Sequence, residues 1–226
     1  MAGAAFFDLD RTLISRSSSL SLAPAFHARG LLPRRDRVKA GLAQLVFMRY
    51  GAGTTRVGQT AESGMALLRG LPVETMREIV RDAVDSAFKP YVYADALGLV
   101  ARHRERGERS FIVSAALQEV VDALVEELGL DGGLGSTAEV VNGHYTGRLL
   151  RRLDGPAKAK AVMALAEEEE IDLGAATAYS DSVSDVPFLE VVGRPVVVNP
   201  DRALRRVAEE RCWRVLRFRE KAFPAA

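Results

Sequence analysis

Residues 4–13 of the chain are Ala4-Ala5-Phe6-Phe7-Asp8-Leu9-Asp10-Arg11-Thr12-Leu13. The apolar residues at the start of this stretch are typical of a buried strand, and two carboxylates follow directly after it. Ligands of open parallel sheets bind at the carboxyl ends of the strands. Carboxylates at such an end suit a hard cation such as Mg²⁺, and they also suit nucleophilic and acid–base roles. The alternative interpretation is a strand end followed by an Asp-rich turn.

Length and composition set the class of protein. The chain has 226 residues, which is enough for one α/β domain with an insertion, and its hydrophobic content of 48% is typical of globular proteins. The net charge of +1 argues against binding to nucleic acid through a large basic field. Cys212 is the only cysteine, which excludes a disulfide framework. The sequence shows neither a signal-peptide pattern nor an apolar run of the about 18 residues that span a membrane, so we expect a cytoplasmic protein without a transmembrane segment.

The region from about residue 15 to 92 is predicted to be an inserted helical subdomain. Apolar residues recur at helical spacing in the stretches 38–46 and 73–84. No strand pattern is visible before Phe111-Ile112-Val113, whereas a doubly wound fold normally has its second strand about 30 residues after the first. We therefore predict a core of residues 1–14 and 93–226, with residues 15–92 as a helical cap over the active end of the first strand.

Beyond residue 93 the sequence alternates between strand and helix patterns. A helix is expected over about 117–128, and Asn142-Gly143 indicates the type I′ turn of a hairpin. A second helix begins near Pro156. Further elements are predicted as a strand at 176–179, a strand at 195–198 and a short helix from about Asp201. This order predicts an α/β fold with a doubly wound, mainly parallel sheet.

A serine and a lysine are further candidates for the site, because both can bind an anion. Ser114 follows the strand Phe111-Ile112-Val113, where its hydroxyl suits either a phosphate oxygen or the N-cap of the next helix. Lys158 lies in the first turn of the helix near Pro156, where the helix dipole disfavours a lysine unless it faces an anion. Lys160 is the competing candidate, and an ordinary surface position is the alternative for both lysines.

Asp181 and Asp185 follow the predicted strand 176–179. They are either carboxylates of the site or residues that cap turns of the loop. Together with Asp8 and Asp10 they would bring four carboxylates to one crevice. Such a group is electrostatically costly unless a divalent cation and a lysine accompany it.

In order and spacing, these residues resemble the motifs of the haloacid dehalogenase-like phosphatases along the whole chain. The residues that carry the resemblance are Asp8, Asp10 and Thr12 of the first motif, Ser114, Lys158, and the pair Asp181 and Asp185. The helical insertion resembles the small cap of the phosphoserine phosphatase-like branch. The sequence around the motifs is most similar to the bacterial subfamily IB hydrolases.

The resemblance implies a Mg²⁺-dependent phosphomonoesterase. Asp8 would attack phosphorus and form an aspartyl-phosphate, while Asp10 would protonate the leaving group and then activate water. Mg²⁺ would be held by Asp8, the backbone carbonyl of Asp10 and Asp181.

The remaining motif residues would bind the phosphoryl group or support those that do. Ser114 and Lys158 would stabilise the phosphoryl oxygens, and Asp185 would orient Lys158 or a metal-bound water. Thr12 and Arg11 are counted with the substrate-binding residues, with mere covering of the loop as the alternative for Arg11. The cap would exclude water and select the leaving group.

Several positions depart from the family pattern. Ser17 stands where the phosphoserine phosphatases have a Glu that holds the substrate amine, and Gly64 stands where their cap Arg would bind the carboxylate. Both departures argue against phosphoserine as the substrate. Arg11 and Ser180 replace residues that are commonly Gly or small, and Ser184 replaces an Asn.

The expected partner is a small phosphorylated metabolite. Phosphoserine phosphatase, a phosphotransferase or mutase using the same intermediate, and a catalytically quiet regulatory protein are the alternatives. The apolar stretch 38–50 with its basic neighbours is typical of cap packing, and a lipid-like leaving group or a membrane surface is its alternative partner. No sequence feature indicates the oligomeric state.

Overall fold

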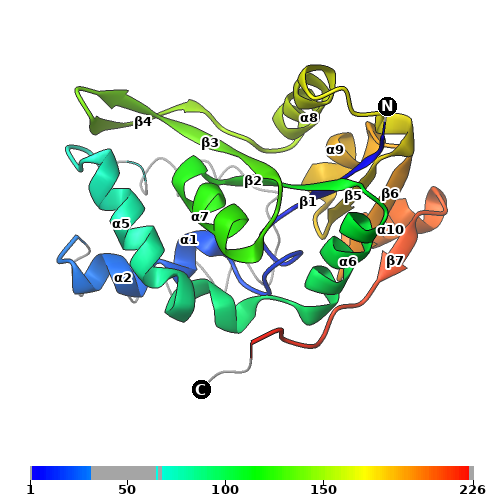
Figure 1. The fold of residues 1–226 in the computed structure, drawn as a ribbon, viewed down its shortest axis with the longest axis horizontal. Coiled ribbons are helices and arrows are strands. Elements are labelled where there is room, and N and C mark those ends of the chain that lie inside the picture. The colour runs from blue at the N-terminus through cyan, green and yellow to red at the C-terminus, as the bar shows by residue number, and fades with distance from the viewer. Residues whose placement is uncertain (1, 32–64, 66–67, 224–226) are drawn as a thin grey trace.

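The computed structural model describes residues 2–31, 65 and 68–223. Within these residues the central element is a seven-stranded sheet with the order β4-β3-β2-β1-β5-β6-β7 (Figure 1). Neighbouring strands run parallel, except in the β3–β4 hairpin. The strands are β1 (Ala4–Phe7), β2 (Arg109–Leu117), β3 (Gly132–Val141), β4 (His144–Arg151), β5 (Thr177–Ser180), β6 (Arg194–Val198) and β7 (Arg214–Leu216). The predicted doubly wound, mainly parallel sheet is confirmed.

Helices cover both faces of the sheet (Figure 1). Ala5 and Phe7 of β1 pack into the buried apolar cluster on one face of the sheet. Ala4 and Phe6 pack into the apolar cluster on the opposite face. Because both faces are buried, the strand is a continuous apolar run rather than an alternating one. The first layer is α6 (Ala94–Glu105) and α7 (Gln118–Leu128), and the second is α8 (Pro156–Glu168), α9 (Val186–Glu190) and α10 (Arg202–Glu210). Short 3₁₀ turns, η3 (Leu173–Ala175) and η4 (Val183–Asp185), flank β5.

The described part of the segment between β1 and α6 is largely helical. Its helices are α1 (Ser18–Ser21), α2 (Ala23–Ala28), α5 (Val73–Ala83), the π-helix η1 (Val84–Phe88) and the 3₁₀ helix η2 (Lys89–Tyr91). Figure 1 shows α2 and α5 side by side at one end of the molecule, and the chain runs from α5 toward α6. The apolar stretches 38–46 and 38–50 and the position Gly64 lie outside the described residues. Among the helices that the structure describes, none is both long and apolar enough to cross a membrane.

β1 lies at the point where the strand order reverses. The chain passes from β1 to β2, β3 and β4 on one side and then returns to β5 on the other side of β1. In open α/β sheets this switch point opens the crevice in which ligands bind, outside the carboxyl ends of the strands. The residues that follow β1 and β5 therefore lie at the expected binding edge.

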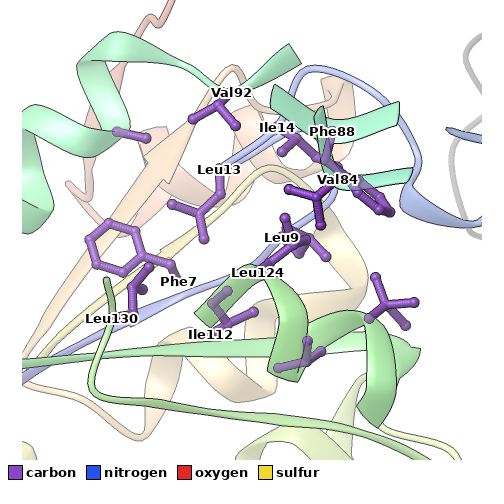
Figure 2. Close-up of a cluster of buried hydrophobic side chains, with 14 of the residues drawn as sticks. Phe7, Leu9, Leu13, Ile14, Val84, Phe88, Val92, Ile112, Leu124 and Leu130 are labelled. Atoms are coloured by element: carbon purple, nitrogen blue, oxygen red, sulfur yellow. The ribbon is translucent and has the colours of Figure 1, made fainter. Parts of the chain in front are cut away.

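The loop after β1 is anchored by apolar packing. Figure 2 shows Leu9, Leu13 and Ile14 in one buried cluster with Phe88 and Val92, which come from the end of the helical segment. All five side chains are fully buried. Since Asp8 and Asp10 flank the anchored Leu9, the backbone that carries both carboxylates is held firmly.

A C-terminal strap, residues 217–222, ties two parts of the binding edge together. The Asn199 amide, which follows β6, donates to the Phe218 carbonyl at 3.2 Å and accepts from the Phe218 N–H at 3.1 Å. Two backbone hydrogen bonds of 2.9 Å join the strap to residues 92–94, where the helical segment returns to the sheet. The strap thus connects the end of β6 to the entry of α6.

Candidate active site

Three carboxylates are buried where β1 and β5 end. Asp8 follows β1 and is 6% exposed, while Asp181 and Asp185 follow β5 and are 4% and 3% exposed. The Asp8 N–H donates to the Tyr179 carbonyl at 2.9 Å, which joins the two strand ends. Asp10 lies two residues beyond Asp8 and remains partly exposed. The structure therefore brings the predicted carboxylates to one edge of the sheet.

Lys158 binds two of these carboxylates. Its Nζ donates to Asp8 Oδ1 at 2.5 Å and to Asp185 Oδ2 at 2.7 Å, and all three side chains are buried. Burial alone would lower the pKa of Lys158, but the charges of Asp185 and Asp8 outweigh it and raise the pKa, so the ammonium stays charged. Lys160 is exposed on the same helix. Of the two candidate lysines, Lys158 is the one at the site.

Asp10 is held at the start of α1. The Ser18 N–H donates to Asp10 Oδ1 at 2.8 Å, and Ser17 is the N-cap residue of that short helix. Burial raises the pKa of the Asp10 carboxyl, and the hydrogen bond from Ser18 opposes this shift. The contribution of Ser17 and Ser18 was not predicted, although serines before a helical stretch are a known N-cap signal.

Arg11 covers the site from the loop. Its backbone adopts the left-handed conformation with φ = 65°, and its Nε lies 3.3 Å from Asp181 Oδ2. This ion pair lacks hydrogen-bond geometry, so Asp181 Oδ2 is buried without a hydrogen-bond donor among the described residues. Burial and the nearby Asp8 charge raise the pKa of Asp181. Thr12 is fully buried, and within the described part of the chain its hydroxyl also lacks a partner.

The prediction for Ser114 was wrong in its local structure. The strand does not end at Val113, because β2 resumes pairing with β3 at Leu117↔Ser136 after an irregularity, which keeps the backbone extended. The N-cap of α7 is Leu117, so Ser114 does not cap that helix. The register Phe7↔Ile112 puts Ser114 one residue beyond the level of Asp8. Ser114 is buried, and its Oγ accepts from the Ala116 N–H at 3.1 Å.

The charge balance of the site calls for a divalent cation. Among the described residues, Asp8, Asp181 and Asp185 face two cationic side chains, Lys158 and Arg11, which leaves one negative charge uncompensated. Burial, assisted by Asp185 and Asp10 and opposed by Lys158, raises the pKa of Asp8 to about 7. A divalent cation beside Asp8 and the donor-free Asp181 Oδ2 would remove this repulsion.

The donor set fits Mg²⁺. In the described ranges, no three His, Cys, Asp or Glu side chains cluster closely enough to bind a metal by themselves. A metal here would use Asp8 and Asp181, with a backbone carbonyl such as that of Asp10 and water as further ligands. Mg²⁺ prefers this all-oxygen composition, with one or two carboxylates and retained waters.

Comparison with known proteins places most of the chain in the family that the sequence motifs resemble. The model of the haloacid dehalogenase-like hydrolases matches residues 5–190. The chain is 42% identical over 217 residues to the inhibition of morphological differentiation protein of Streptomyces azureus, covering 95% of this chain and 78% of that protein. It is 39% identical over 215 residues to a Mycobacterium tuberculosis protein named probable phosphatase, covering 95% and 75%. A phosphoserine phosphatase of the same species is 34% identical over 221 residues, covering 97% and 72%.

Solved structures show the same architecture. A Bordetella pertussis protein of unknown function matches with a TM-score of 0.80 and 26% identity, covering 96% of this chain and 98% of that one. A substrate-bound phosphoserine phosphatase matches with a TM-score of 0.68 and 19% identity, covering 96% and 93%. At 19% identity the second likeness concerns the fold alone.

Proposed function

Because the chain belongs to the haloacid dehalogenase-like hydrolase family, we propose that it hydrolyses a small phosphomonoester through an aspartyl-phosphate on Asp8. It is a phosphomonoester hydrolase, as the relatives named as phosphatases indicate. The observation that carries the mechanism is the buried contact of Lys158 with both Asp8 and Asp185. This contact places a fixed positive charge beside the carboxylate that would meet an anionic phosphoryl group.

Two chemical steps follow from the positions of Asp8 and Asp10. An oxygen of Asp8 attacks phosphorus, the bond to the leaving oxygen breaks, and Asp10 gives that oxygen its proton. Asp10, now ionised, takes a proton from water as the water attacks the phosphoryl group, which releases inorganic phosphate and frees Asp8. Lys158 and Ser114 stabilise the charge on the phosphoryl oxygens.

We assign Mg²⁺ to Asp8, Asp181 and the backbone carbonyl of Asp10. When bound, the ion would neutralise charge on the phosphoryl group and orient it. Arg11 neutralises Asp181 only in part, because its Nε approaches one oxygen without forming a hydrogen bond.

Asp181→Asn is expected to raise the Mg²⁺ concentration for half-maximal activity by at least about tenfold, because a carboxylate ligand is replaced by a neutral amide. Excess Mg²⁺ should recover part of the rate. The measurement is initial phosphate release against Mg²⁺ concentration, with the exposed Asp122→Asn as the matched control. An unchanged Mg²⁺ dependence would remove Asp181 from the metal site.

We further propose that residues 15–92 form a cap that selects the leaving group, on a core of residues 1–14 and 93–226. The support is positional: α1 begins eight residues after Asp10 and its first N–H binds the Asp10 carboxylate. The leaving group would therefore enter between this segment and the sheet edge. The expectation of a lipid-like leaving group rests on residues 38–50, which lie outside the described residues.

Phosphoserine phosphatase is the second candidate, favoured by the 34% identical relative of that name. The position of Ser17 opposes it. Ser17 is buried as the N-cap of α1 and offers no charge to a substrate amine. Each charge-assisted hydrogen bond that is missing costs about 1.5–3 kcal/mol of binding.

We expect phosphoserine to have a lower kcat/KM than uncharged-headed monoesters such as glycerol phosphate. The test is a phosphomonoester panel under identical Mg²⁺, read out as phosphate release, with a sugar acceptor added to detect transfer. If phosphoserine gives the highest kcat/KM by tenfold or more, the second candidate is correct. A phosphorylated acceptor in place of free phosphate would identify a transferase.

A further inference from the structure

Ser180, the last residue of β5, is the inner end of a hydrogen-bonded chain that reaches Asp8. It is fully buried, and its Oγ donates to Asp185 Oδ2 at 2.7 Å. The same Asp185 oxygen accepts from Lys158 Nζ at 2.7 Å, and Lys158 donates to Asp8 Oδ1 at 2.5 Å. The chain crosses from β5 through η4 and α8 to the end of β1.

The Ser180 hydroxyl has a fixed direction. Its Oγ accepts from the Ser182 N–H at 3.4 Å while it donates to Asp185. A carboxylate rotates easily about its last bond, which has a broad energy profile. Two donors on one oxygen, from Ser180 and Lys158, restrict that rotation and fix where Asp185 presents its charge.

The position of Asp185 in turn decides where the Lys158 ammonium lies. An ammonium is a compact charge on a flexible stem, so its acceptors set its position. Among the described residues, Asp8 and Asp185 accept two of its three N–H groups. The third N–H is then left for a phosphoryl oxygen.

We propose that Ser180 is a positioning residue that acts through Asp185 to hold Lys158 in the geometry needed for phosphoryl transfer. The inference rests on the proposed function, because it assigns Lys158 to the transition state. A displacement of about 1 Å at such a group can lower the rate by up to about 100-fold. The departure from the commonly found Gly at this position thus adds a hydroxyl that the lysine depends on.

Ser180→Ala removes this hydroxyl and almost no volume. We expect kcat to fall about tenfold or more while KM changes less than about threefold, since the ammonium is misplaced mainly for the transition state. The Mg²⁺ concentration for half-maximal activity should shift by less than the tenfold expected for Asp181→Asn, because Asp181 is not part of the chain and Asp8, at its far end, keeps its carboxylate. Ser180→Thr, which keeps the hydroxyl, should recover most of kcat. The control is Ser110→Ala, a buried strand serine whose hydroxyl has no partner within the described residues.

A purely structural role predicts a different pattern. A kcat of Ser180→Ala within twofold of wild type, or a loss shared by Ser110→Ala, would overturn the proposal. If Ser180→Thr does not fold, the affinity for inorganic phosphate decides. Ser180→Ala should weaken phosphate binding in the wild-type background and have little further effect in Lys158→Gln, whereas equal effects in both backgrounds would contradict coupling through the lysine.

Phosphate release by the wild-type protein distinguishes a failure of this proposal from a failure of the proposed function. If wild type releases phosphate from no monoester of the panel, the proposed function fails. If wild type is active and Ser180→Ala is equally active, only the role of Ser180 is wrong.

Discussion

Asp8→Asn is expected to reduce phosphate release to background, a loss of at least about 10³-fold. The substitution keeps the volume of the side chain but removes the oxygen nucleophile and its charge. Lys158 retains Asp185 as a partner, so the site should still assemble. The measurement is kcat under saturating Mg²⁺ with an activated aryl phosphate, compared with Asp122→Asn. A variant that retains one tenth of the wild-type rate would rule out the covalent mechanism.

The same variant should be as stable as wild type, or more stable, in the absence of metal. Burial raises the pKa of Asp8 to about 7, so the folded state binds this proton more tightly than the unfolded chain does. The stabilisation from this group is present at low pH and is lost as the pH rises through about 7. A neutral amide avoids that loss at pH 8. Thermal unfolding in EDTA at pH 8 tests this, and a Tm more than about 5 °C below wild type would mean that inactivity reflects misfolding.

Asp10→Asn should reveal the acid–base step through the leaving group. We expect kcat/KM for an alkyl phosphate to fall by about 10²–10⁴, because a poor leaving group needs a proton. With p-nitrophenyl phosphate the first step needs little protonation, so a much smaller loss is expected. The ratio of the two losses is the measurement.

The Asp10→Asn side chain should keep its position, so that a loss of activity reports on proton transfer. The amide oxygen of an asparagine can still accept the 2.8 Å hydrogen bond from the Ser18 N–H, so the side chain should keep its place. Mg²⁺ dependence should change little, because only the backbone carbonyl of Asp10 is assigned to the metal. Equal losses on both substrates would remove Asp10 from the acid role.

Local patterns predict those parts of the fold whose signal lies in a few adjacent residues. The hairpin turn is an example: Asn142 and Gly143 both have positive φ, as a type I′ turn requires. Asp201 accepts from the Leu204 N–H as the N-cap of α10, where a helix start was expected. The candidate carboxylates follow apolar strands, which is a pattern visible without the structure.

The start of β3 shows what such patterns miss. Gly132, Gly133 and Gly135 indicate a turn by composition, but they belong to a strand beneath α7. A Cβ on Gly133 would lie 2.4 Å from a Val121 methyl, so the glycines allow the helix to approach the strand closely. This requirement comes from tertiary packing, which residue type alone does not express.

The choice between Lys158 and Lys160, and the role of Ser180, depend on the same kind of information. The two lysines are two residues apart on one helix, so they point to different sides of it. Lys158 lies on the buried side and Lys160 lies on the exposed side. Ser180 bonds to a residue five positions away through a turn that the sequence shows only as a loop rich in Asp and Ser. Both assignments required the register of the sheet and the direction of the helix.

The central place of β1 has a consequence for synthesis on the ribosome. β1 is made before both of its neighbours, because Phe7 pairs with Ile112 on one side and with Tyr179 on the other. At typical elongation rates of about 5–20 residues per second, β1 would wait about 10–30 seconds for its second neighbour. During this interval its apolar residues and both strand edges lack their native cover, which exposes the nascent chain to aggregation.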